Sequence, residues 1–245
     1  TINGNNFDRN TSGTTGILFD TNGVFTVGSN ALAPVVLTNN SFVGGNGNAE
    51  FGIGGIVRDG GLYFQVGTTD PNQTNTFTDN RGAGIGLTFR GGSTNVINID
   101  NQVFQNTQAL NATFAGEGVH LVVNDTSTLT GQTQRSTFRN NASDGLRFDV
   151  TGNTLTQFAE LNNYIVGNLG TPSTNLFENN GNDGLEVLRT GSGQVNNFQI
   201  LGNTFQNNAN NGIHLSAFNV DREDTYLITD NLIRRNGTLN SLVTT

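Results

Sequence analysis

One sequence pattern recurs along nearly the whole chain and constrains the fold more than any other feature. The pattern is Asn-x-Phe, an Asn three residues after the Phe, and a Gly that opens a Gly-Ile-x-Leu segment. Its clearest copies are residues 203–215, 175–187, 136–148 and 75–87, and weaker copies centre on Phe7, Phe42, Phe104 and Ile233. Such a repeat predicts a stack of similar units rather than a compact sphere.

The anchor positions of the repeat are 7, 42, 77, 104, 138, 177, 205 and 233. The intervals between them range from 27 residues, between positions 77 and 104, to 39, between positions 138 and 177. An interval near 28 residues fits a bare rung, and the excess fits loop insertions, which a solenoid tolerates at fixed phases of its repeat.

Each part of the pattern has a structural interpretation, clearest in the copy around Phe205. Side chains alternate along a strand, so Asn203 and Phe205 share a face, which we expect to point inward. The Asn can then stack on the Asn of the next rung. Asn208 is expected at the corner after the strand, where Asn tolerates positive φ. Ile213 and Leu215 predict a second strand with both side chains inward.

A third strand is expected before the Asn-x-Phe segment. The positions seven and five residues before the anchor are apolar in four rungs, as in Ile97 and Ile99. In the rungs of Phe77, Phe138 and Phe177 these positions are polar or turn-like, which predicts that insertions shift the register there.

These patterns predict an all-β chain, a right-handed single-stranded parallel β-helix of about eight rungs that spans residues 1–245 as one repeat domain. Only 3 prolines occur, as continuous parallel ladders require, and no segment has sustained helical periodicity. Hydrophobic residues make up 33% of the 245 residues, which is enough for a narrow core.

The repeat resembles that of right-handed β-helix proteins of the pectin-lyase-like superfamily. The resemblance covers nearly the whole chain and implies a fold more than a function. It implies either a polysaccharide lyase, hydrolase or epimerase, or a surface protein or adhesin without catalysis. The family's hydrolases use clustered Asp residues with a Gly-His-Gly segment, and its lyases use a basic residue, often with Ca²⁺.

Several features separate this chain from the enzymes of that superfamily. It has no Gly-His-Gly segment, no Lys and no Trp. These absences favour a non-catalytic protein and leave an Arg- or His-based site as the alternative.

The outward residue of the Gly-Ile-x-Leu segment predicts a column along one sheet. Its members are Leu18, Gly54, Gly86, His120, Arg147, Glu186 and His214. As a catalytic site, His120 or His214 would act as a general base and Arg147 would bind a substrate carboxylate. Asp149 lies on the same face, so a binding site would comprise Arg147, Asp149, Glu186 and His214. The alternative is a surface ladder of ion pairs, each of which contributes little.

A second column precedes the Gly and contains Glu117, Asp144, Asp183 and Asn211. Three stacked carboxylates are candidate ligands for Ca²⁺, which prefers oxygen. Asp-Gly and Asn-Gly are equally typical of tight turns, in which the side chain bonds its own backbone. Ca²⁺ is the one cofactor that the sequence suggests.

The net charge of −8 disfavours nucleic acid as a partner, and no apolar run is long enough to cross a membrane. Residues 1–7 already resemble a rung, and residues 239–245 have no amphipathic capping pattern. We therefore expect self-association or neighbouring domains of the same polypeptide, with a polysaccharide as another candidate partner. The expected function is an extracellular or cell-surface structural or adhesive scaffold, either a block of a larger surface protein or a subunit that assembles into a filament or matrix. The alternative is a polysaccharide lyase or hydrolase that acts on an acidic polysaccharide.

Overall fold

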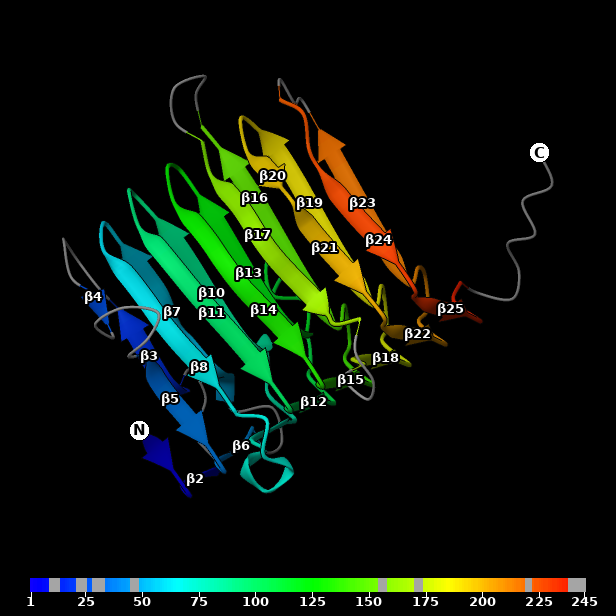
Figure 1. The fold of residues 1–245 in the computed structure, drawn as a ribbon. Coiled ribbons are helices and arrows are strands. Elements are labelled where there is room, and N and C mark those ends of the chain that lie inside the picture. The colour runs from blue at the N-terminus through cyan, green and yellow to red at the C-terminus, as the bar shows by residue number, and fades with distance from the viewer. Residues whose placement is uncertain are drawn as a thin grey trace.

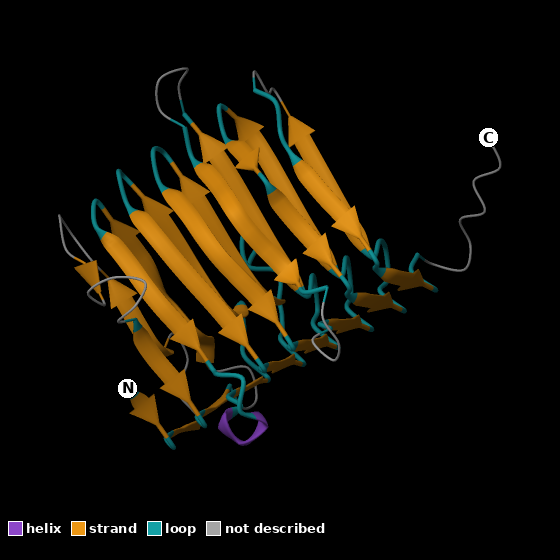
Figure 2. Ribbon diagram, viewed as in Figure 1, coloured by secondary structure: helices purple, strands orange, loops and turns teal. Residues whose placement is uncertain are grey.

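The computed structural model describes residues 1–8, 14–20, 26–27, 34–44, 49–153, 158–169, 174–218 and 222–237. Residues 239–245, for which no capping helix is expected, lie outside this description. The described chain is almost entirely β-structure, and its single helical element is a 3-10 turn, η1 (Pro71–Gln73) (Figure 2).

The strands form three parallel sheets that run along the molecule (Figure 1). Sheet A contains, in order, β1 (Ile2–Asn3), β5 (Val35–Thr38), β8 (Gly61–Val66), β11 (Thr94–Asp100), β14 (Thr128–Gln134), β17 (Glu160–Gly167), β21 (Phe198–Leu201) and β24 (Tyr226–Thr229), with β4 (Thr26–Val27) beside β8 and β20 (Gln194–Asn196) beside β17. Sheet B contains β2 (Asn6–Asp8), β6 (Ser41–Val43), β9 (Thr76–Thr78), β12 (Val103–Gln105), β15 (Thr137–Arg139), β18 (Leu176–Glu178), β22 (Thr204–Gln206) and β25 (Leu232–Arg234). Sheet C contains β3 (Thr14–Asp20), β7 (Ala49–Arg58), β10 (Ala83–Arg90), β13 (Glu117–Asn124), β16 (Leu146–Gly152), β19 (Leu185–Gly191) and β23 (Ile213–Phe218).

The chain passes through sheets A, B and C in turn and then returns to sheet A one layer further along. Successive passes pair in parallel, as in Phe138 opposite Phe177 and Phe177 opposite Phe205. The eight layers of sheet B are the eight rungs that the anchors predict. The fold is a right-handed parallel β-helix, as the repeat indicates.

The anchor residues of sheet B form a single file of stacked rings. From Phe7 to Phe205, consecutive ring centroids are 4.6–5.0 Å apart, and the rings are nearly parallel, with interplanar angles of 2–14°. This separation equals the spacing of adjacent strands, because one ring sits on each rung. The expected inward file of phenylalanines is confirmed.

The residue two positions before each anchor, which is Asn in six of the eight rungs, forms a polar ladder. Asn40 Nδ2 donates to Asn75 Oδ1 at 2.9 Å, and Asn175 Nδ2 donates to Asn203 Oδ1 at 2.9 Å. Gln102 and Ser136 continue the ladder in the middle rungs. From Asn40 to Asn203 the side chains of this ladder are buried and hydrogen-bonded, which meets the requirement for polar groups in a core.

The corner between sheets B and C differs from the sequence prediction. Positive φ occurs two residues after the anchor, as at Asn140 (54°) and Asn207 (56°), and not three residues after it. The Asn three residues after the anchor is buried and forms a second ladder, in which Asn141 Nδ2 donates to Asn180 Oδ1 at 2.9 Å. The prediction was wrong because the left-handed residue at the corner turns the following side chain into the core.

The predicted register shifts of sheet A occur in two of the three rungs. In the rungs of Phe77 and Phe177 the strands β8 and β17 end at Val66 and Gly167. Val66 pairs with Ile99, and Val166 pairs with Ile200, so the inward residue of sheet A lies further before the anchor in these two rungs. In the rung of Phe138 the register is kept, since Gly131 and Thr133 pair with Ile97 and Ile99. Thr133 is tolerated inside because its hydroxyl and that of Tyr164 lie 3.0 Å apart.

The Phe column predicts a large stability penalty for losing one ring. We expect Phe138→Ala to lower the free energy of unfolding by about 3–5 kcal/mol, because it leaves a cavity between two stacked neighbours. Thr137→Ala, whose side chain points outward on the same strand, should change it by about 0.5 kcal/mol or less. Chemical denaturation of both variants measures this; equal effects would contradict the stacked core.

Candidate functional site

The outward column of sheet C lies where the sequence predicts it. The strand register pairs Leu18 with Gly54, Gly54 with Gly86, and Gly86 with His120. It continues from His120 to Arg147, Glu186 and His214. All seven predicted members, including Gly54, therefore occupy one line across the sheet.

Ion pairs and hydrogen bonds link the second half of this column. His120 Nε2 lies 2.9 Å from Asp149 Oδ2, and Arg147 Nε donates to Asp149 Oδ1 at 2.9 Å. Arg147 Nη1 lies 3.0 Å from Glu186 Oε2, and Glu186 Oε1 lies 3.2 Å from His214 Nδ1. We call His120, Arg147, Asp149, Glu186 and His214 the charged row. It contains the predicted ion-pair ladder from Arg147 to His214 and adds the pair of His120 with Asp149.

The two histidines lie at opposite ends of the charged row. His120 is fully buried, whereas the His214 side chain is 40% exposed. Three strand steps separate them, which is roughly 14 Å at normal strand spacing. The two candidate bases therefore do not share one site, and Arg147 lies between them.

The acidic column of Glu117, Asp144 and Asp183 is buried. Asp144 Oδ1 accepts from the Asp183 backbone N–H at 2.8 Å, and Asp183 Oδ1 accepts from the Asn211 backbone N–H at 2.7 Å. The Asp side chains thus accept hydrogen bonds from backbone N–H groups at the corner of the next rung. The turn interpretation had expected hydrogen bonds to the backbone of their own rung. Glu117 accepts from the Ala115 N–H instead.

The pKa values of two buried carboxyl groups in this region, Asp144 and Asp149, are shifted in opposite directions. It raises the pKa of Asp144 to about 6; the Asp183 N–H opposes this, and the negative charges of Glu186 and Asp183 add to it. Burial would also raise the pKa of Asp149, but hydrogen bonds and charge from His120 and Arg147 outweigh it and hold that pKa below its ordinary value.

Only part of the acidic column belongs to a group that could hold a metal. Within the described residues, one set of ligand atoms converges to within 4.8 Å, and it comes from Asp183, Glu186 and His214. Glu117 and Asp144 are not members of that set. The predicted Ca²⁺ ligands are thus distributed between two environments, and Ca²⁺ binding stays a prediction.

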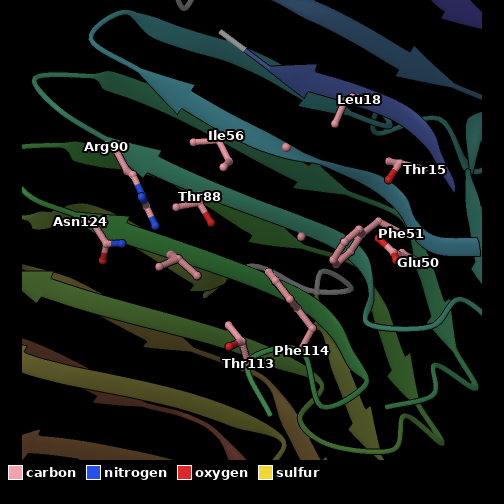
Figure 3. Close-up of a pocket in the computed structure, with 13 residues that line it drawn as sticks. Thr15, Leu18, Glu50, Phe51, Ile56, Thr88, Arg90, Thr113, Phe114 and Asn124 are labelled. Carbon is pink, nitrogen blue, oxygen red and sulfur yellow. The ribbon is translucent and has the colours of Figure 1, made fainter. Parts of the chain in front are cut away.

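Leu18 and Gly86 of the column line an open groove with a volume of about 570 Å³ (Figure 3). Strands β3, β7, β10 and β13 form its base, and the loop that carries Thr113 and Phe114 forms one wall. Its lining residues are Thr15, Leu18, Glu50, Phe51, Gly55, Ile56, Gly86, Thr88, Arg90, Thr113, Phe114, Val122 and Asn124.

The glycines of the column explain how the groove is shaped. A Cβ at Gly86 would lie 2.6 Å from the Phe51 ring, and one at Gly54 would lie 3.0 Å from it. Glycine at both positions therefore lets this ring lie over the sheet. Phe114 packs edge-on against Phe51 at 4.7 Å and against His120 at 5.2 Å between ring centroids.

The predicted candidate residues lie beside the groove but do not line it. His120 is buried beside Phe114, and His120, Arg147 and His214 are not among the lining residues. Sequence analysis missed Phe51 and Phe114, because Phe114 lies in a loop insertion outside the repeat. It also missed Ser216, although its position two residues after His214 puts both on one face.

Comparisons with family models, with curated proteins and with solved structures found no match to this chain. The described part of the chain contains no helix with the length and hydropathy that crossing a bilayer requires.

The charged row predicts a specific pH dependence. We expect Asp149→Asn to lower the free energy of unfolding by about 2 kcal/mol at pH 7, because it weakens charged hydrogen bonds with His120 and Arg147. The folded state favours ionised Asp149, so this stabilisation is present above the unfolded pKa of about 4 and is lost as pH falls through the lower folded value. The difference between wild type and variant should therefore shrink between pH 5 and pH 3.

Denaturation at a series of pH values measures this difference. The exposed pair of Asp20 with Arg58 supplies the control, since Asp20→Asn should have an effect of about 0–1 kcal/mol throughout. A difference for Asp149→Asn that stays constant down to pH 3 would contradict the assigned role.

Proposed function

We propose that this protein is a structural β-helical rod whose copies stack end to end, in an extracellular or cell-surface assembly. The observation that carries the proposal is the exposure of apolar side chains in the last described rung. Its strands β24 and β25 continue sheets A and B, yet their large apolar side chains are about half exposed. These side chains are Leu227 (47%), Ile228 (46%), Leu232 (49%) and Ile233 (51%), and Phe218 (57%) at the end of β23 in the preceding rung is exposed as well.

The direction of the polar ladders supports a second copy as the partner. In both ladders a backbone N–H donates to the side-chain oxygen of the next rung toward the C-terminus, as in Asn203 to Asn231 at 2.9 Å and Asn208 to Asn236 at 3.0 Å. By continuation, the last described rung offers N–H donors and the first described rung offers the Asn5 side-chain oxygen. The two ends are therefore complementary, and the contact is head-to-tail.

The apolar surfaces at the two ends also match. Ile233 continues the file of anchors at one end, and the partly buried Phe7 begins it at the other. Stacking would bury both, and it would pair strand edges that otherwise invite non-specific association. The resemblance of the repeat to pectin-lyase-like proteins supports the extracellular location by analogy alone.

Sedimentation velocity and electron microscopy of the full chain test this proposal. We expect association that increases with protein concentration, with rods longer than one copy. Ile233→Asp should reduce association by at least about tenfold, because it places an unpaired charge in the contact. Leu169→Asp is the matched control, since Leu169 is 59% exposed but follows β17 on the side of an interior rung.

A wild-type chain that stays monomeric at high concentration would overturn end-to-end stacking. Equal behaviour of the two Asp variants would also overturn it, because the contact would then not involve the end rung.

The groove favours a second candidate function, the binding of a saccharide. Its lining combines the aromatic residues Phe51 and Phe114 with the polar side chains of Glu50 and Arg90, which is the mixture of apolar surface and a few polar groups typical of ligand sites. Because the groove lies on the side of the rod, stacking would leave it accessible. A scaffold that holds a polysaccharide would combine both properties.

Calorimetric titration with neutral and uronic-acid oligosaccharides tests saccharide binding. We expect Phe114→Ala to weaken binding by about tenfold or more, through the loss of one aromatic contact. Tyr63→Ala, on the outer face of sheet A, should have no effect. Absence of binding across the panel would remove this candidate, and unsaturated products would instead support the alternative of a polysaccharide lyase.

A further inference from the structure

Three ligand atoms converge between the last two strands of sheet C. Asp183 Oδ2 lies 3.0 Å from His214 Nδ1, and Glu186 Oε1 lies 3.2 Å from the same nitrogen. All three atoms lie within 4.8 Å of one another. Ligands about 2.1 Å from a tetrahedral metal ion are roughly 3.4 Å apart, so small side-chain movements would complete a coordination shell.

Each of these three residues has its other polar atom in contact with a group outside the cluster. The backbone and side-chain N–H groups of Asn211 donate to Asp183 Oδ1 at 2.7 and 2.8 Å. Arg147 Nη1 lies 3.0 Å from Glu186 Oε2, and Ser216 Oγ lies 3.2 Å from His214 Nε2. The atoms that remain are the three that converge. Outer partners of this kind orient the ligands of metal sites.

The local charge also suits a cation. Asp144, Asp183 and Glu186 are buried close together, and Arg147 is the permanent cation that contacts Asp144 and Glu186. Arg147 is shared with Asp149 as well. Buried carboxylates in excess of their cations are costly unless another positive group neutralises them.

We propose that Asp183, Glu186 and His214 bind one divalent transition-metal ion of the Zn²⁺ class. One imidazole nitrogen and two carboxylates are a ligand set that suits Zn²⁺, whereas Ca²⁺ requires six to eight oxygens. With Nε2–H donating to Ser216 Oγ, Nδ1 offers its lone pair to the metal. The exposed side of His214 leaves a position for water or another ligand.

The site would join two rungs. Asp183 and Glu186 belong to the rung of β19, and His214 belongs to β23. Metal binding would therefore hold the last strand of sheet C against its neighbour. Because the ion binds only the folded arrangement, it would raise the melting temperature of the chain.

Titration of ZnCl₂ into the tag-free, chelator-treated full chain tests the site. We expect one equivalent to bind, the melting temperature to rise, and Co²⁺ to give the visible absorption bands of a tetrahedral site. His214→Ala and Glu186→Gln should each weaken binding by at least about 100-fold, and Ser216→Ala, which removes only an outer partner, by about 10-fold. Glu178→Gln is the control, because Glu178 contacts Gln206 across the same two rungs in sheet B.

Circular dichroism at low temperature establishes that each variant is folded before its affinity is compared. Three results would overturn the proposal: no bound Zn²⁺, equal affinity in the wild type and in folded His214→Ala, or a preference for Ca²⁺ over Zn²⁺. The Ser216→Ala variant keeps the test decisive if the ligand variants fail to fold, since unchanged affinity there would contradict the orienting role.

Discussion

The structure depends on hydrogen-bonded amides stacked in register inside a thin apolar core. A parallel strand that slips by one residue turns its apolar side chains outward, so a solenoid needs something that fixes each rung on the next. Two ladders supply this, one before the Phe column, as in Asn40 on Asn75, and one after it, as in Asn141 on Asn180. A slipped rung would leave buried amides without partners, which costs more than the loss of a few contacts.

Register also determines what the outer faces can contain. Residues in the same phase of successive rungs lie one strand spacing apart, so like charges in one column would repel. The charged row avoids this because Arg147 lies between acidic partners on its own strand and on the next, Asp149 and Glu186. Where the column contains Gly54 and Gly86 instead, the missing side chains make room for the Phe51 ring. One column thus provides both a groove and a network of charges.

The features that repeat could be predicted from the sequence, and those that occur once could not. The file of anchors and the line from Leu18 to His214 follow from periodicity alone. Phe114 reaches the groove through a loop insertion, whose path no period determines. Arg189 is a similar case: it occupies an inward position of β19, is 1% exposed, and pairs with Asp224 at 2.9 Å. A buried charge at a core position violates the repeat, and only its partner from the next rung explains it.

The last described strands of the three sheets, β23, β24 and β25, contain both the candidate metal ligand His214 and the exposed apolar side chains. The stability of a solenoid is close to a sum over neighbouring rungs, so a rung with one neighbour is held by half the contacts of an interior rung. In sheet C, His214 of β23 is held by Asp183 and Glu186 of the preceding rung. In sheets A and B, the apolar residues of β24 and β25, one rung further along, are about half exposed. A second copy and a metal ion would each compensate for the smaller number of contacts at this end of the solenoid, in different ways. A copy would replace the missing neighbour, whereas an ion would strengthen the contact that already exists. The two therefore do not compete, and a bound metal would present the next rod with a more rigid end.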